Sequence, residues 1–154
     1  KSPTEWASET RILVAEDSES DRFLMHEAWS FGRLQGQLEF VGDGEELLDT
    51  LRGTAEVGQD LPALVLLDLD MPRVDGFAAL EAIKRDPVLR RVPVTVWATS
   101  PTPFQKDRAL RLGADAVLTK PESFWVFVAT LRSVTRYWVS FKEGDLNFPF
   151  RDCA

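Results

Sequence analysis

The chain has 154 residues, a formal net charge of −7 and a single cysteine. This length suits one compact domain, the acidic balance argues against a nucleic-acid-binding protein with its basic face, and a lone cysteine excludes an internal disulfide. No apolar run approaches the roughly 20 residues of a membrane-spanning helix, so we expect a cytoplasmic protein that binds neither membrane nor nucleic acid.

Short aliphatic segments alternate with longer helical patterns along the chain. The sequence predicts strands at 11–15, 38–41, 63–67, 92–97 and 116–118, and helices at 20–31, 45–52, 76–85, 104–112 and 122–138. Asp43 and Thr102 each precede a Glu or Gln by three residues, which is the spacing of a helix-capping box, and Gly113 is placed to end a helix. Five strand–helix repeats predict an α/β fold with a doubly wound parallel sheet and helices on both faces.

Charged residues follow three of the predicted strands. Glu16 and Asp17 follow the first strand, Asp68 and Asp70 the third, and Lys120 the fifth. Ligands of open parallel sheets bind at the carboxyl ends of the strands, so we expect these side chains to meet at one edge. Clustered carboxylates repel each other unless a cation binds, and their oxygens suit Mg²⁺, while a lysine suits a phosphoryl oxygen. The edge therefore predicts formation of an acyl phosphate on an aspartate.

These residues lie in motifs that resemble a known family. Glu16-Asp17, Asp68-Leu69-Asp70-Met71-Pro72-Arg73-Val74-Asp75-Gly76 and Thr119-Lys120-Pro121 are similar to the motifs of the receiver domain of two-component response regulators, the CheY-like family. The resemblance covers about residues 11–138. It implies a flavodoxin-like fold, with five strands in the order 2-1-3-4-5 and five helices. We expect a leader at residues 1–10, the receiver domain at 11–140 and a C-terminal tail at 141–154.

The resemblance also implies a role for each residue of the edge. Asp68 is expected to accept the phosphoryl group, and Lys120 to bind it. Mg²⁺ is expected to bind Asp17, Asp68 and the backbone carbonyl of Asp70, with Glu16 acting mainly through water. The peptide bond that follows Lys120 is often cis in the family.

Two positions depart from the family pattern. Ala98 stands where the family normally has Ser or Thr, and Val117 stands where it often has Tyr or Phe. Thr99 offers a substitute hydroxyl only through a bulge, because a shift of one residue turns a strand side chain to the other face. We therefore expect Asp68 to be phosphorylated but the output to be weaker or to follow another route.

The last predicted helix and the tail carry more apolar residues than a core stripe needs. The additional residues are Trp125, Val126, Tyr137, Trp138, Phe141, Phe148 and Phe150. They either cover the domain's own core or form the surface of a homodimer or partner complex. This helix end, the tail and the long connection before the third strand resemble phytochrome-associated response regulators. That resemblance implies a sensor histidine kinase partner of the bacterial phytochrome type.

The expected function is that of a stand-alone response regulator, which catalyses only its own phosphorylation and dephosphorylation. Output is then by protein–protein contact. One alternative is a degenerate receiver that acts as a phosphorylation-independent interaction module, which Ala98 and Val117 favour. A second is a haloacid-dehalogenase-like phosphatase, which also uses Asp-x-Asp after an apolar strand. That family places the motif on its first strand, whereas Asp68 follows the third predicted strand here.

Overall fold

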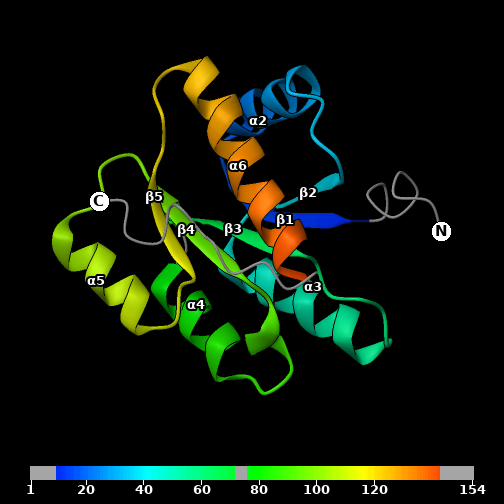
Figure 1. Cartoon of the computed structure of the whole chain (residues 1–154). Helices are drawn as coiled ribbons and strands as arrows, with labels where there is room; N and C mark the ends of the chain where they lie inside the picture. Colours follow the sequence, from blue (N-terminus) through cyan, green and yellow to red (C-terminus); the bar gives the residue numbers. More distant parts are fainter. Residues whose placement is uncertain (1–9, 72–75, 143–154) are drawn as a thin grey trace.

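The computed structural model describes residues 10–71 and 76–142, and Figure 1 shows the arrangement of the elements. The strands are β1 (Arg11–Ala15), β2 (Gln37–Val41), β3 (Leu64–Asp68), β4 (Val94–Ala98) and β5 (Ala116–Thr119). The helices are α2 (Glu19–Phe31), α3 (Gly44–Glu56), α4 (Gly76–Arg85), α5 (Pro103–Arg111) and α6 (Phe124–Lys142), with a 3-10 turn at Leu89–Arg91. All five predicted strand–helix repeats are therefore present.

The strands form one sheet in the order β2-β1-β3-β4-β5, and every neighbouring pair is parallel. This confirms the predicted flavodoxin-like order. All five residues of β3 are buried, as expected for a central strand that is covered on both faces. The fourth strand begins at Val94, two residues later than predicted, because Pro93 has no N–H to donate to a sheet ladder.

Alternate residues of each strand point into two separate cores. In β1, Leu13 and Ala15 join a core with α3, α4 and α5, whereas Ile12 and Val14 join a core with α2 and α6. Figure 1 shows α2 and α6 together on one side of the sheet. The two faces are thus covered as the sequence predicted, and the ends of the strands remain available for a site.

Helix caps stabilise the helix starts near the carboxyl edge of the sheet. Asp43 accepts a hydrogen bond from the backbone N–H of Glu46 at 2.8 Å. Thr102 and Gln105 form the predicted reciprocal capping box, with bonds of 2.9 and 3.1 Å. Gly113 follows α5 with φ +107°, a conformation that favours glycine.

The last helix has a buried stripe and an exposed face. Phe127, Val128 and Leu131 are buried, whereas Trp125 and Val126 are 65% and 53% exposed. The helix begins two residues later than predicted and continues to Lys142. The side chains of Trp138 and Phe141 lie outside the described residues. So do residues 1–9 of the predicted leader and residues 143–154 of the predicted tail, which include Phe148 and Phe150. No helix in the described ranges is both long enough and apolar enough to cross a membrane.

Candidate functional site

The carboxyl ends of β1, β3 and β5 bring the predicted residues to one edge of the sheet. Ala15, the last residue of β1, pairs with Leu67 of β3, so Glu16 and Asp68 follow side by side. Thr119, the last residue of β5, places Lys120 directly after it at the same edge. Residues more than a hundred positions apart in the sequence therefore meet because their strands are parallel.

Lys120 is the centre of the site. Its side chain is only 16% exposed, and its Nζ lies 2.8 Å from Oδ2 of Asp68 and 3.4 Å from Oε1 of Glu16. The carboxylates of Asp21 and Asp70 each lie 3.7 Å from the same Nζ. Burial by itself would lower the pKa of Lys120, but the hydrogen bond and the charge of Asp68, followed by the charges of Glu16 and Asp21, hold this pKa above its ordinary value. The ammonium is therefore charged at physiological pH.

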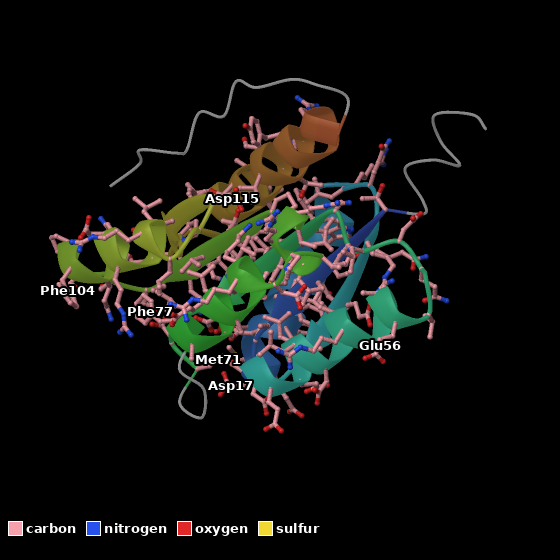
Figure 2. The ribbon with its side chains drawn as sticks, turned by 90° about the horizontal axis from the view of Figure 1, so that it is seen from below. Asp17, Glu56, Met71, Phe77, Phe104 and Asp115 are labelled. Atoms are coloured by element: carbon pink, nitrogen blue, oxygen red, sulfur yellow. The ribbon has the colours of Figure 1, made fainter. Side chains whose placement is uncertain are left out.

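Three carboxyl groups form a candidate metal site beside this lysine. Ligand oxygens of Glu16, Asp17 and Asp68 all lie within 4.8 Å of one another. Glu16 and Asp68 are buried, whereas Asp17 is exposed at the periphery of the molecule (Figure 2). Oε2 of Glu16 is buried and has no hydrogen-bond donor in the described structure. Hard oxygen ligands with one side open to water fit Mg²⁺, which retains several waters when it binds proteins.

Burial and the crowding of carboxyl groups raise the pKa of Glu16. Burial, and then the closeness of the carboxyl groups of Asp68 and Asp21, raises the pKa of Glu16 to about 9, although Lys120 opposes the shift. The metal-free carboxyl therefore holds a proton at neutral pH. Because a bound cation replaces this proton, metal binding should strengthen as the pH rises.

The raised pKa of Glu16 predicts an unusual pH dependence of stability. The unfolded chain releases this proton near pH 4.5, whereas the folded chain retains it up to about pH 9. The folded state then binds more protons, so the free energy of unfolding of the metal-free protein falls as the pH rises through this window. The slope is at most about 1.4 kcal/mol per pH unit.

Urea denaturation in EDTA at several pH values would measure this slope. We expect Glu16→Gln, which has the shape of the protonated side chain but does not titrate, to remove it. Equal slopes in the wild type and in this variant would contradict the assignment.

Asp68 is fixed by contacts to both of its carboxylate oxygens. Oδ1 accepts a hydrogen bond from the backbone N–H of Asp70 at 2.8 Å, while Oδ2 pairs with Lys120. The carboxylate of Asp70 is engaged elsewhere, because its Oδ2 accepts bonds from the backbone N–H and the hydroxyl of Thr99 at 2.9 and 2.8 Å. It is not one of the three converging carboxylates, so the predicted ligand remains its backbone carbonyl.

Ala98 lies inside β4, whereas Thr99 lies beyond its end. Ala98 is the last residue of β4 and is buried, and its carbonyl accepts the backbone N–H of Lys120 at 2.8 Å. The pairing of β4 with β3 runs without a bulge to Trp97, and its pairing with β5 runs without a bulge to Ala98. Thr99 lies beyond the strand, and its hydroxyl bonds Asp70. Val117 is buried in β5.

The loop after Asp68 is only partly described. Met71 is buried, and Pro72 to Asp75 lie outside the described residues. Gly76 begins α4, and a Cβ at this position would lie 2.9 Å from a methyl carbon of Leu69. The expected cis bond after Lys120 was wrong, since no peptide bond in the described ranges is cis.

Two contacts of the site were missed in the sequence. One is Asp21, which stands on the first turn of α2, and the other is the bond between Thr99 and Asp70. A signal for Asp21 exists, because Ser18 precedes it by three residues, as in a helix cap, and accepts its backbone N–H at 3.3 Å. A helix that starts at the edge of the sheet directs its first turn toward that edge.

Known proteins share this sequence pattern and fold. The family model of the response regulator receiver domain matches residues 12–132. The probable methanogenesis regulatory protein FilR2 of Methanothrix harundinacea is 36% identical over 133 residues, which cover 86% of each chain. Response regulator Rcp1 of Synechocystis is 30% identical over 129 residues, which cover 83% of this chain and 88% of Rcp1.

Solved structures agree with the sequence relatives. Response regulator RPA3017, in red light signaling of R. palustris, superposes with a TM-score of 0.78 at 30% identity, covering 91% of this chain and 98% of that chain. The phosphorylated cyanobacterial phytochrome response regulator RcpA superposes with a TM-score of 0.76 at 28% identity. The match covers 92% of this chain and 99% of RcpA. The resemblance to phytochrome-associated response regulators is therefore confirmed.

Proposed function

The chain belongs to the response regulator receiver family, and from that premise we propose that it accepts a phosphoryl group on Asp68 from a sensor histidine kinase in a Mg²⁺-dependent reaction. The observation that carries the proposal is the position of the Asp68 carboxylate. It lies 2.8 Å from the ammonium of Lys120 and within 4.8 Å of ligand oxygens of Glu16 and Asp17. A phosphoryl acceptor needs a carboxylate with a cationic group on hand and a place for a metal ion, and this arrangement supplies both.

Each residue has a separate task in this reaction. Asp17 and Asp68 would hold Mg²⁺ directly, with the carbonyl of Asp70 and with Glu16 acting through water. The ion supplies positive charge to the phosphoryl oxygens when it is bound. A carboxylate oxygen of Asp68 forms the new O–P bond as the P–N bond to the donor histidine breaks. Lys120 then moves from the carboxylate to a phosphoryl oxygen and stabilises its charge.

Of the two alternative functions, the degenerate receiver is retained and the phosphatase is not. The phosphatase is not retained, because the sheet order and the family are those of a receiver. The degenerate receiver has one observation in its favour: the buried Ala98 has no hydroxyl, and the hydroxyl of Thr99 is already bonded to Asp70. It predicts no phosphorylation at all, which separates it from the main proposal.

Phosphotransfer from purified histidine kinases would test the proposed partner. The similarity to Rcp1, RcpA and RPA3017 supports a red-light-sensing phytochrome kinase. We expect the fastest transfer from such a kinase within a panel from the same cell. Failure of every kinase in the panel to transfer its phosphoryl group would contradict the proposal.

Restoring the hydroxyl at position 98 should strengthen the response to phosphorylation. A hydrogen bond to the charged phosphoryl group contributes roughly 1.5–3 kcal/mol and forms only in the phosphorylated state. We therefore expect Ala98→Thr to shift the equilibrium toward the active conformation by about ten- to a hundredfold. The measurement is the ratio of the two conformations in NMR spectra of the phosphorylated protein.

Ala98→Val is the matched control for this variant, because valine has the shape of threonine without its hydroxyl. Both variants carry the same cost of extra volume at a buried position. If the two variants shift the equilibrium equally, the hydroxyl is not the cause and the idea fails.

We also propose that the exposed face of α6, with the tail, forms a homodimer. Trp125 packs edge-on against Phe31 of α2 at 4.9 Å, and both side chains remain more than half exposed. The buried side of the same helix contacts the strand that borders the site, since Trp97, which pairs with Asp68 in the sheet, stacks on Phe127 of α6 at 5.6 Å. Burying such aromatic surface is a common basis of protein association.

Analytical ultracentrifugation would test this dimer. We expect the wild type to be dimeric and Trp125→Glu to be monomeric. Phe104→Glu is a matched control, because Phe104 is 72% exposed but lies on α5, on the other face of the sheet. A monomeric wild type, or equal loss of the dimer in both variants, would contradict the assignment.

A further inference from the structure

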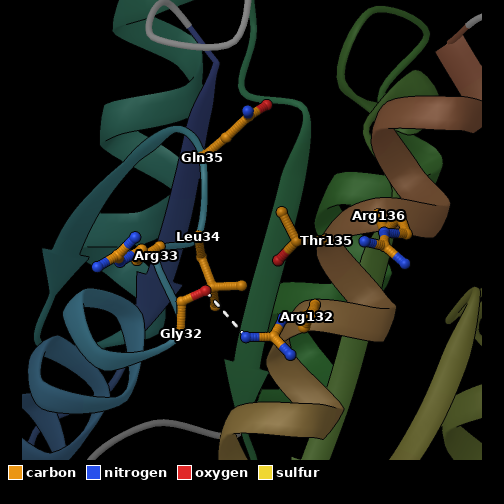
Figure 3. A pocket seen from close by; sticks show the side chains of 7 residues that line it. All are labelled: Gly32, Arg33, Leu34, Gln35, Arg132, Thr135 and Arg136. Atoms are coloured by element: carbon orange, nitrogen blue, oxygen red, sulfur yellow. Dashed lines mark hydrogen bonds between the residues drawn. The ribbon is translucent and has the colours of Figure 1, made fainter.

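A second site candidate lies away from Asp68. A cavity of about 330 Å³ opens between α6 and the turn at residues 32–35, which connects α2 to β2 (Figure 3). Because this turn leads into the amino end of β2, the cavity lies toward the edge of the sheet opposite the phosphorylation site. Nothing in the proposed reaction uses it.

The walls of this cavity are cationic in an otherwise acidic protein. The chain has 25 acidic and 18 basic residues, yet the described residues that line the cavity include three arginines and no acid. Neither Arg132 nor Arg136 forms an ion pair with a carboxylate in the described ranges. Unpaired guanidinium groups around a hollow give a local positive potential that attracts anions.

One face of α6 supplies the donors. Arg132 and Arg136 are four residues apart, so they lie on the same face of the helix with Thr135 beside them. In Figure 3, Arg132 and Thr135 point from α6 toward the turn, whereas Arg33 points away from α6. Arg136 lines the same cavity, so α6 supplies two guanidinium groups and one hydroxyl to its wall.

A structural role explains only part of this arrangement. Arg132 donates to the carbonyl of Gly32 at 3.0 Å, where a cation stabilises the carboxyl end of α2. A guanidinium has five N–H groups, so this single bond leaves donors for a ligand. The contact does not account for Arg136, or for the lack of acids among the wall residues that the structure describes.

We propose that this cavity binds a small ligand that carries a phosphate or diphosphate group. Arginine forks bind phosphate oxygens in pairs of parallel hydrogen bonds. Two forks and the Thr135 hydroxyl together suit an oxyanion with three or more oxygens better than a planar carboxylate. The volume lies at the lower end of the range of small-ligand pockets.

Titration with inorganic pyrophosphate, followed by NMR in EDTA, would test the proposal. Without divalent cations the acidic site cannot retain the anion, so the result is independent of the proposed function of Asp68. We expect shifts confined to the turn at 32–35 and to α6 around Arg132 and Arg136, with binding in the millimolar range or tighter. The double variant that combines Arg132→Gln with Arg136→Gln loses both charges and should bind pyrophosphate at least about tenfold more weakly.

Arg90→Gln/Arg91→Gln is the matched control, because it removes the same charge from exposed residues of the 3-10 turn. This pair should bind pyrophosphate as the wild type does. Arg132→Lys/Arg136→Lys keeps the charge but loses the fork, and intermediate affinity would support the proposal. The proposal would be overturned if pyrophosphate caused no saturable shifts. It would also be overturned if the pocket double variant and the control double variant lost affinity equally, or if citrate bound as tightly as pyrophosphate.

Discussion

Asp68→Asn is expected to abolish phosphorylation. With acetyl phosphate and Mg²⁺, the wild type should gain one phosphoryl group per chain, and the variant should lose at least about a thousandfold in rate because it lacks the attacking oxygen. The carboxamide keeps the size of the side chain in its buried position, so the fold should be retained. Intact-protein mass spectrometry would measure the incorporation, and circular dichroism would check the fold.

Asp70→Asn is the control for this loss. Its carboxylate accepts bonds from Thr99, while the bond to Asp68 comes from its backbone N–H, which the substitution keeps. This variant should still be phosphorylated on Asp68. Incorporation into Asp68→Asn at the wild-type rate would show that the acceptor lies elsewhere.

Mg²⁺ is expected to stabilise the folded protein and to need Asp17 for this effect. A ligand at a hundred times its Kd stabilises the folded state by about 2.7 kcal/mol, which corresponds to about 5–10 °C in the thermal midpoint of a domain of this size. The gain arises because only the folded chain brings the carboxyl oxygens of Glu16, Asp17 and Asp68 together for the cation. EDTA should reverse it.

Asp17→Asn should remove most of this thermal shift and slow phosphorylation with it. Asp60→Asn is a matched control, because Asp60 is exposed in the connection before β3, at the opposite edge of the sheet. Differential scanning calorimetry with and without Mg²⁺ would measure both variants. A full shift in Asp17→Asn would mean that the ion binds at another place.

Most of the fold could be predicted because its signals are local. Apolar runs define the strands, and the caps at Asp43 and Thr102 define helix starts that the structure reproduces. The start of the last helix was placed too early, at residue 122 instead of Phe124, since favourable helix-forming residues there do not show where the first hydrogen bond forms. Such ends depend on the surrounding tertiary packing.

The candidate site could be predicted only where position along the strands determines it. Glu16 and Lys120 directly follow strands and Asp68 ends one, so their meeting is a consequence of the parallel sheet. The contact of Asp21 with Lys120 depends on how α2 leaves the edge, and the bond between Thr99 and Asp70 joins residues 29 positions apart. The cap at Ser18 places Asp21 on the first turn of α2, but no local pattern encodes its distance to Lys120 or the bond between Thr99 and Asp70.

The most direct test of the central claim is a crystal structure of the protein with Mg²⁺ and beryllofluoride, which mimics an aspartyl phosphate. We predict beryllium bonded to a carboxylate oxygen of Asp68, a fluorine in contact with Lys120, and Mg²⁺ bound by Asp17 and Asp68. A folded protein with an unmodified Asp68 under these conditions would contradict the account and favour the degenerate receiver.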